Sequence, residues 1–304
     1  MTECNTKCIV CASFDLCDVP FGYNFKKKWR GVKECNKCGM LFIFPQPTAL
    51  ELKELYSRDY FEGGDYRCGH AGSCFEESER IVSQVLLEKI ISMQPKGKFL
   101  DIGCAGGQML NAVRQKGFEP FGVEFSEEAA QNARDKFQLN VITGDIHAAQ
   151  LESNFFDVVF MGDVLEHVPD PVEVMKEIYR ITRPNALVVI LCPTQTNTMF
   201  SRLGFLFYNI AGKKATVNLP PYHLLEFRPK SMKYLIEHTG FSVVRSEGTA
   251  MKPSEIAQRN SLLQNVTKKL MQYPNYALTS VFNICGDRIN MFAKKTSFTI
   301  YNEI

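Results

Sequence analysis

Four cysteines near the N-terminus have the spacing of a metal site. Cys8 and Cys11 form one C-x-x-C pair, and Cys35 and Cys38 form a second pair with 23 residues between the two. Each C-x-x-C turn places two thiolates at neighbouring corners of a tetrahedron, so two such turns complete a Cys4 zinc site. The alternative is a set of unligated or redox-active thiols. The spacing favours zinc, and Gly39 suits the tight turn that lets backbone amides approach the sulfurs.

A second group of informative residues follows the apolar run "KFLDIG". Asp101 is followed by Gly103, Gly106 and Gly107, and a helical pattern begins directly afterwards. A glycine-rich turn between a strand and a helix lets a ligand lie against bare backbone at a helix N-terminus. The turn is not a G-x-x-x-x-G-K-[ST] phosphate loop, and its leading carboxylate would repel a pyrophosphate. It therefore favours a cationic ligand, with a flavin or nicotinamide dinucleotide as the alternative.

Three further apolar runs also end in acids. "GVEFS" contains Glu124, "TGD" ends at Asp145, and "FMGDVLEHVPDP" supplies Asp163, Glu166 and His167. The carboxyl ends of parallel strands share one edge of a sheet, and open α/β folds bind ligands at that edge. An acid such as Glu124 can accept hydrogen bonds from both hydroxyls of a ribose there, and Asp145 can lie near an adenine amino group.

These residues need a sheet to bring them together, and the sequence predicts one. From residue 97 onward, strand-like runs alternate with helical patterns, which predicts parallel βαβ units with helices on both faces. A last strand is expected in "DRINMFAKK". We expect three parts: a zinc-binding module at 1–47, a helical linker and pocket cover at 48–95, and a main domain at 96–304 with lid insertions near 197–229 and 253–285.

Composition narrows the class of protein. The chain has 304 residues, of which 45% are hydrophobic, so it can bury a sizeable core. A net charge of +2 gives no strong field for nucleic acid or anionic lipid, which favours a small or glycan-like partner. We find neither a run of about 20 apolar residues nor the features of a secretory signal, and we expect a cytoplasmic protein without a transmembrane helix. The sequence assigns no oligomeric state.

Taken together, these motifs resemble those of the class I S-adenosylmethionine-dependent methyltransferases. The resemblance rests on "LDIGCAGG", "GVEFS", "TGDI" and "DVLEHVPDP" and covers roughly residues 76–295. It implies a Rossmann-like α/β fold, with a seven-stranded sheet covered by helices on both faces, beside the small zinc-ribbon module. The usual turn of the family is D-x-G-x-G-x-G, and Ala105 stands at its middle glycine. Alanine is expected to fit there with a negative φ.

The resemblance also implies the cofactor, S-adenosylmethionine, and residues that hold it. Asp101, Gly103 and the neighbouring backbone would hold the methionine end, Glu124 the ribose, and Asp145 with Ile146 the adenine. The chemistry agrees, because the sulfonium and ammonium groups favour nearby acids and the carboxylate favours free amides. The full expected set is Asp101, Gly103, Cys104, Ala105, Gly107, Glu124, Phe125, Asp145, Ile146 and Asp163.

Candidate catalytic residues follow from the reaction. Methyl transfer from a sulfonium needs mainly alignment, and it needs a base only where the acceptor carries a proton. His167 follows the fourth strand, and Tyr222 and His223 lie in "PPYHLLEF". A loop position over the strand ends favours a catalytic role for His223. His167 equally suits a structural role at a helix start.

A looser resemblance concerns the acceptor. The zinc module, "ELYSRDYF" and "YHLLEF" look like a subgroup that includes sugar methyltransferases, which implies a sugar or glycan-related acceptor and leaves C-, O- and N-methylation open. Three alternatives stay open: an RNA methyltransferase guided by the zinc ribbon and "KKKWR", a methyltransferase of a quinone or lipid-like acceptor suggested by the apolar stretch 200–212, and a cofactor-binding protein without chemistry. Residues 1–47 carry 7 Lys and Arg against 4 Asp and Glu, a balance of only +3, which argues against RNA.

Overall fold

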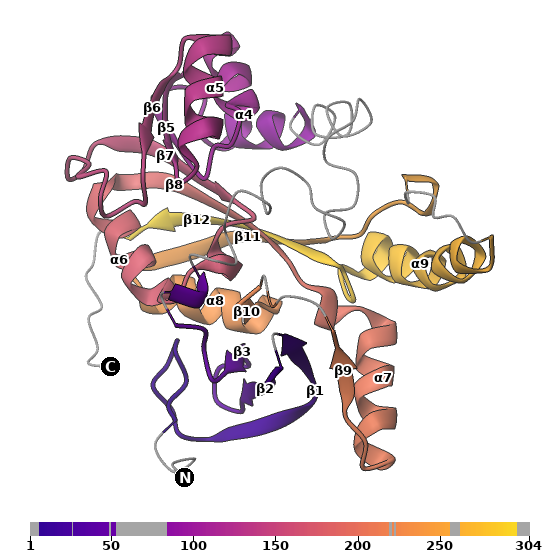
Figure 1. Cartoon of the computed structure of the whole chain (residues 1–304). Coiled ribbons are helices and arrows are strands. Elements are labelled where there is room, and N and C mark those ends of the chain that lie inside the picture. The colour runs from indigo at the N-terminus through magenta and orange to yellow at the C-terminus, as the bar shows by residue number, and fades with distance from the viewer. Residues whose placement is uncertain are drawn as a thin grey trace.

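The protein is built around two β-sheets (Figure 1). A computed structural model describes residues 6–25, 27–48, 50–52, 84–218, 221, 223–255 and 262–296. The larger sheet has seven strands in the order β11-β12-β8-β7-β4-β5-β6, and the smaller has five in the order β10-β3-β2-β1-β9. The strands of the larger sheet are β4 (Lys98–Ile102), β5 (Glu119–Glu124), β6 (Asn140–Thr143), β7 (Phe156–Gly162), β8 (Thr182–Pro193), β11 (Phe241–Thr249) and β12 (Arg288–Lys295).

Within the larger sheet, β12 runs antiparallel to both of its neighbours, and the pairs formed by β4 to β8 are parallel. Side chains alternate between the two faces along each strand. In β8, Val188 and Ile190 join the apolar core on one face, whereas Leu187 and Val189 join the core on the other. Burial on both faces explains why these strands are continuous apolar runs, and it confirms the expected α/β sheet.

Helices supply the partners of both cores. The helix at 84–93, α4 (Gln108–Gln115) and α5 (Glu127–Phe137) pack on one face, and α6 (Pro171–Ile181) and α8 (Pro229–His238) pack on the other. Local chemistry fixes where two of them begin. The Ser126 side chain accepts a hydrogen bond from Ala129 N–H at α5, and Asp170 accepts from Val172 and Glu173 N–H at α6.

The smaller sheet joins the N-terminal module to a distant part of the chain. Its strands are β1 (Leu16–Phe25), β2 (Lys28–Cys35), β3 (Leu41–Phe44), β9 (Ala215–Val217) and β10 (Leu225–Glu226). β9 pairs with β1, and β10 pairs with β3. The segment 197–229, expected as a lid insertion, therefore supplies both edge strands of the N-terminal sheet.

Two helices complete the described chain, α7 (Met199–Ile210) and α9 (Leu262–Phe282). α9 lies within the second expected insertion, and Figure 1 shows it projecting to the side of the larger sheet. Most of the expected linker at 48–95 lies outside the described residues. Among the described helices, none combines the length and the apolar character that crossing a bilayer requires.

Candidate active site

The expected site residues follow the carboxyl ends of adjacent parallel strands. In the register of the sheet, Ile102 at the end of β4 lies opposite Val123 of β5 and Met161 of β7. Glu124 at the end of β5 lies opposite Thr143 of β6. Four strands therefore end side by side, and the segments that follow them form one edge. This edge is where open α/β folds bind ligands.

The turn between β4 and α4 requires glycine at two positions. Gly103 has a φ of +75° and Gly107, the N-cap of α4, has a φ of +80°. A Cβ atom added to Gly103 would lie 2.3 Å from Val164 Cγ2, and one added to Gly107 would lie 2.6 Å from Leu139 Cδ1. Only glycine combines this backbone conformation with such close neighbours.

Ala105 corrects the expectation of a negative φ, because its φ is +46°. Residues 103, 105 and 107 are all left-handed, and this alternation folds the backbone into a tight loop. The left-handed conformation costs a residue with a Cβ atom about 1–2 kcal/mol. A hydrogen bond helps to hold it, since Ala105 N–H donates to Glu124 Oε2 at 2.8 Å.

Glu124 connects two loops at this edge. Besides Ala105, its carboxylate accepts a hydrogen bond from Ser126 N–H, at 2.8 Å from Oε1. The residue is only 7% exposed, as is suitable for a charge held by backbone donors. Asp101, the last residue but one of β4, is also buried, and so is Cys104 in the turn that follows. By contrast, the ring of Phe125 is 66% exposed directly beside Glu124.

The remaining predicted cofactor residues follow β6 and β7. Asp145 Oδ1 accepts hydrogen bonds from the N–H groups of His147 and Ala148, and Ile146 between them is buried. Asp163 has a φ of +57° and forms an ion pair with Arg288 of β12. The ion pair links the end of β7 to the beginning of the antiparallel strand.

Two histidines and a glutamate meet above the same edge. His167 closes the short helix η1 (Leu165–His167), and the centroid of its ring lies 5.0 Å from that of His223. One ring nitrogen of each histidine and a carboxylate oxygen of Glu166 all lie within 4.8 Å of one another. Leu224 N–H donates to the carbonyl of Glu166 at 2.9 Å, which fixes the loop that carries His223. Tyr222 lies outside the described residues.

Burial sets the protonation of this cluster. Glu166 is 1% exposed, and burial, followed by the charge of Asp163, raises its pKa to about 8. Burial, followed by the nearby His167, lowers the pKa of His223 to about 4. Near pH 7, Glu166 is therefore mainly protonated and His223 is neutral. The Cys192 thiol also donates to Glu166 Oε2 at 3.3 Å.

Sequence analysis placed Glu166 beside His167 at a strand end without selecting it as a site residue, and it missed Arg288. Arg288 has no such local pattern, because its strand is far along the chain and approaches the site from the opposite direction. Its role depends on the tertiary structure alone.

Removing the buried acid gives a prediction about stability. The raised pKa means that folded Glu166 holds a proton between about pH 4.5 and 8, where the unfolded chain has lost it. The free energy of unfolding therefore falls as the pH rises through this window. We expect Glu166→Gln to be more stable than the wild type at about pH 8.5 by roughly 2–4 kcal/mol, and equal to it near pH 4.

Urea unfolding at both pH values measures the effect. Glu152→Gln is the matched control, because Glu152 is exposed, and it should leave the pH dependence unchanged. A Glu166→Gln protein with the same pH dependence as the wild type would show that Glu166 titrates as an ordinary carboxyl.

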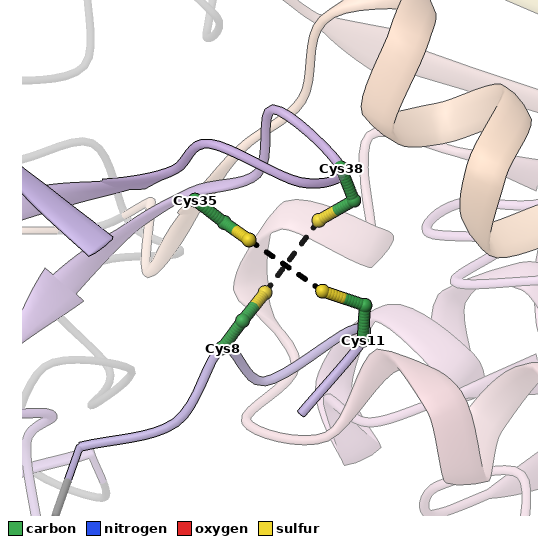
Figure 2. Close-up of side chains that lie close together, drawn as sticks. All are labelled: Cys8, Cys11, Cys35 and Cys38. Carbon is green, nitrogen blue, oxygen red and sulfur yellow. Dashed lines mark hydrogen bonds between the residues drawn. The ribbon is translucent and has the colours of Figure 1, made fainter. Parts of the chain in front are cut away.

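The four N-terminal cysteines converge in the structure (Figure 2). The Sγ atoms of Cys8 and Cys38 are 3.6 Å apart, and those of Cys11 and Cys35 are 3.5 Å apart. All four side chains are buried. A tetrahedral zinc ion with bonds of about 2.3 Å separates its sulfur ligands by about 3.8 Å, close to these distances. The cysteines thus fit a tetrahedral metal ion.

Comparison with known proteins finds a family model that matches part of the larger sheet. Residues 100–190 match the family model described as a methyltransferase domain. The chain is 27% identical over 168 residues to a ubiquinone biosynthesis O-methyltransferase of Coxiella burnetii, a match that covers 52% of this chain and 69% of that protein. It is 29% identical over 130 residues to a demethylmenaquinone methyltransferase of Bacillus mycoides, covering 40% of this chain and 54% of that protein.

Solved structures share the fold. A SAM-dependent methyltransferase from Archaeoglobus fulgidus superposes with a TM-score of 0.50 at 22% identity, covering 71% of this chain and 94% of that one. A SAM-dependent methyltransferase from Thermotoga maritima gives a TM-score of 0.50 at 17% identity, covering 81% and 98%. At these identities the likeness concerns the fold, and it confirms the Rossmann-like arrangement expected from the sequence.

Proposed function

We propose that the chain is a class I S-adenosylmethionine-dependent methyltransferase that methylates a hydroxyl oxygen of a small-molecule acceptor, with His223 as the base. The observation that carries this proposal is the cluster of Glu166, His167 and His223 at the carboxyl edge of the sheet. The partly buried imidazole of His223 is neutral near pH 7 and can accept a proton, and a hydroxyl acceptor has one to lose.

Three residues of the cluster have separate roles in this reaction. A ring nitrogen of His223 would accept the hydroxyl proton while the acceptor oxygen takes the methyl group. The cofactor supplies the methyl group on a positively charged sulfur, which leaves uncharged. Glu166, which is protonated near pH 7, and the His167 ring lie beside the His223 ring and would fix its orientation. Alignment of the oxygen with the methyl group supplies the rest of the rate.

We assign the cofactor to the edge formed by β4, β5 and β6. The backbone from Gly103 to Gly107 would hold the methionine end, with Asp101 near its cationic groups. Glu124 would bind the ribose hydroxyls, because its carboxylate is fixed at the end of β5 by two backbone donors. The exposed ring of Phe125 would cover one face of the adenine.

Ile146 and Asp145 would bind the edge of the adenine, since they follow the neighbouring strand β6. Asp163 would lie between the cofactor and the acceptor, with its ion pair to Arg288 forming part of the wall of the site.

Two acceptor classes are supported. The names of the relatives favour a quinone precursor, in which a ring hydroxyl would be methylated. The exposed side chains of α7 provide apolar surface for such a molecule; they are Leu203, Leu206, Phe207 and Ile210. A sugar or glycan-related acceptor is the second candidate, and a cavity lined by cations, described in the next subsection, favours it.

Methyl transfer can be tested with labelled S-adenosylmethionine. The purified protein would be incubated with dihydroxyphenol quinone precursors in one series and with sugar acceptors, free and nucleotide-linked, in another. We expect label in a small molecule of one series. Label in RNA alone would replace the proposal with the zinc-ribbon alternative. Cofactor binding without transfer to either series or to RNA would indicate a protein that binds the cofactor without chemistry.

We further propose that Cys8, Cys11, Cys35 and Cys38 bind zinc, which would stabilise a module too small to form a large core of its own. Cys35→Ser is expected to lose about one zinc ion per chain and to destabilise the protein, because the four thiolates act as one site. Metal analysis and thermal unfolding measure both effects. The exposed Cys17 gives the matched control, Cys17→Ser. Equal zinc content in the two variants would contradict the assignment.

A further inference from the structure

A cavity of about 390 Å³ lies between the N-terminal module and the helices α7 and α8. Residues from three separate segments line it, namely the end of β2 with the turn after it, the first turn of α7 and the beginning of α8. The lining residues that matter here are Glu34, Asn36, Gly39, Arg202, Arg228 and Lys230. Cys35 of the cysteine cluster also lines the cavity, whereas none of the lining residues belongs to the candidate active site.

The lining carries more positive than negative side chains. Arg202, Arg228 and Lys230 contribute three positive charges, and Glu34 contributes one negative charge, to which Cys35 would add as a zinc-bound thiolate. The Arg202 guanidinium also donates to the carbonyl and side-chain oxygens of Asn197. Glu34 engages one end of the Arg228 guanidinium, at 2.7 Å between Nη1 and Oε1. Arg228 Nε is buried and has no hydrogen-bond partner among the described residues. A buried donor of this kind is costly unless something accepts its hydrogen bond.

The backbone adds to this field. α8 begins at Pro229, so the positive end of its dipole and the first turn of the helix lie at the cavity. Gly39 has a φ of +77°, and the stem of Lys230 lies over it, with Cδ 3.4 Å from where a Cβ of residue 39 would stand. The bare backbone at Gly39 therefore gives Lys230 room beside the module.

We propose that this cavity binds a phosphate or diphosphate group. Guanidinium groups match the tetrahedral oxygens of phosphate with paired donors, and an ammonium adds a mobile charge. A helix N-terminus is a further favourable element for an anion. Two arginines, a lysine and a helix start thus line one space of suitable size.

The position suits a phosphate that is part of the acceptor. His223 and Arg228 are five positions apart in the chain, which limits their Cα separation to about 17 Å. An acceptor with its phosphate in the cavity could present a hydroxyl several bonds away to His223. This role rests on the proposed function, whereas binding of phosphate in the cavity does not.

Calorimetric titration with inorganic pyrophosphate at constant ionic strength tests the site. We expect saturable binding by the wild type and about tenfold weaker binding by Lys230→Ala, because one charge-assisted contact is lost. Lys233→Ala is the matched control, since Lys233 is also on α8 but does not line the cavity. Absence of saturable binding, or equal losses in the two variants, would overturn the proposal.

Methylation assays separate this proposal from the proposed function. Pyrophosphate that competes with the acceptor would place the phosphate of the acceptor in the cavity, and noncompetitive binding would indicate a free anion there; either outcome supports a phosphate site. Methyl transfer without pyrophosphate binding would remove the site and leave the methyltransferase assignment intact. Pyrophosphate binding without transfer to any hydroxyl acceptor would leave the site intact and remove the proposed function.

Discussion

Replacing His223 with alanine is expected to lower kcat for a hydroxyl acceptor by about 10²- to 10⁴-fold and to leave the affinity for S-adenosylmethionine unchanged. The loss follows because His223 would receive the proton of the acceptor from its place in the cluster with Glu166 and His167 at this edge. Methylation assays at saturating acceptor give kcat, and equilibrium titration gives the cofactor affinity.

The pH dependence provides a second measure of the same role. Burial, followed by the nearby His167, lowers the pKa of His223 to about 4, and the base must be deprotonated to act. His223 should therefore stay deprotonated from about pH 6 to pH 7, and kcat should be constant over that range. As the pH falls toward about 4, His223 gains a proton and kcat should decrease.

His238 offers a matched control, because it is an exposed histidine whose ring stacks on Tyr234 of the same helix. His238→Ala should retain wild-type kcat. A loss smaller than tenfold in His223→Ala, or a wild-type kcat that follows an ordinary histidine pKa near 6.5, would exclude His223 as the base.

The second large effect is expected at Glu124. Glu124→Ala should weaken binding of S-adenosylmethionine by about 10²- to 10³-fold, because two charge-assisted hydrogen bonds to the ribose would be lost. The substitution also releases Ala105 N–H and Ser126 N–H, which hold the glycine-rich turn and the start of α5 in place. Equilibrium titration with the cofactor measures the change.

Two further variants separate binding from folding. Glu119→Ala is the matched control, because Glu119 is exposed at the other end of the same strand. Glu124→Gln keeps an acceptor oxygen for only one of the two backbone donors and lacks the charge, so we expect a smaller loss of thermal stability than in Glu124→Ala, with an intermediate affinity. Wild-type affinity in a folded Glu124→Ala protein would show that the ribose binds elsewhere.

Local patterns in the sequence were sufficient to find much of the candidate site. Asp101 and Glu124 end apolar strands, and the glycines after Asp101 permit left-handed backbone, so their types and spacing predict a strand, a turn and a helix. The shared edge of these strands then follows from parallel topology alone. The negative φ expected at Ala105 was wrong, because a tight loop can impose a left-handed conformation on a residue with a Cβ atom.

The assembly of the smaller sheet could not be deduced in this way. β10 has only two residues, and its pairing with β3 depends on backbone hydrogen bonds between segments more than 180 residues apart. A pattern of alternating side chains cannot be recognised in so short a strand. The closing of the module by residues 215–226 is thus a property of the tertiary structure.

Local sequence patterns predict the α/β class, the glycine-rich turn with its acids and the metal-site spacing of the four cysteines. Each of these features depends on residues that are close neighbours along the chain. Only the tertiary structure decided that His223 meets Glu166 and His167, that Arg288 pairs with Asp163, and that Arg202, Arg228 and Lys230 surround one cavity. These contacts join distant segments of the chain. The Glu166 and His223 side chains are buried only when those segments pack together, and this burial sets their pKa values.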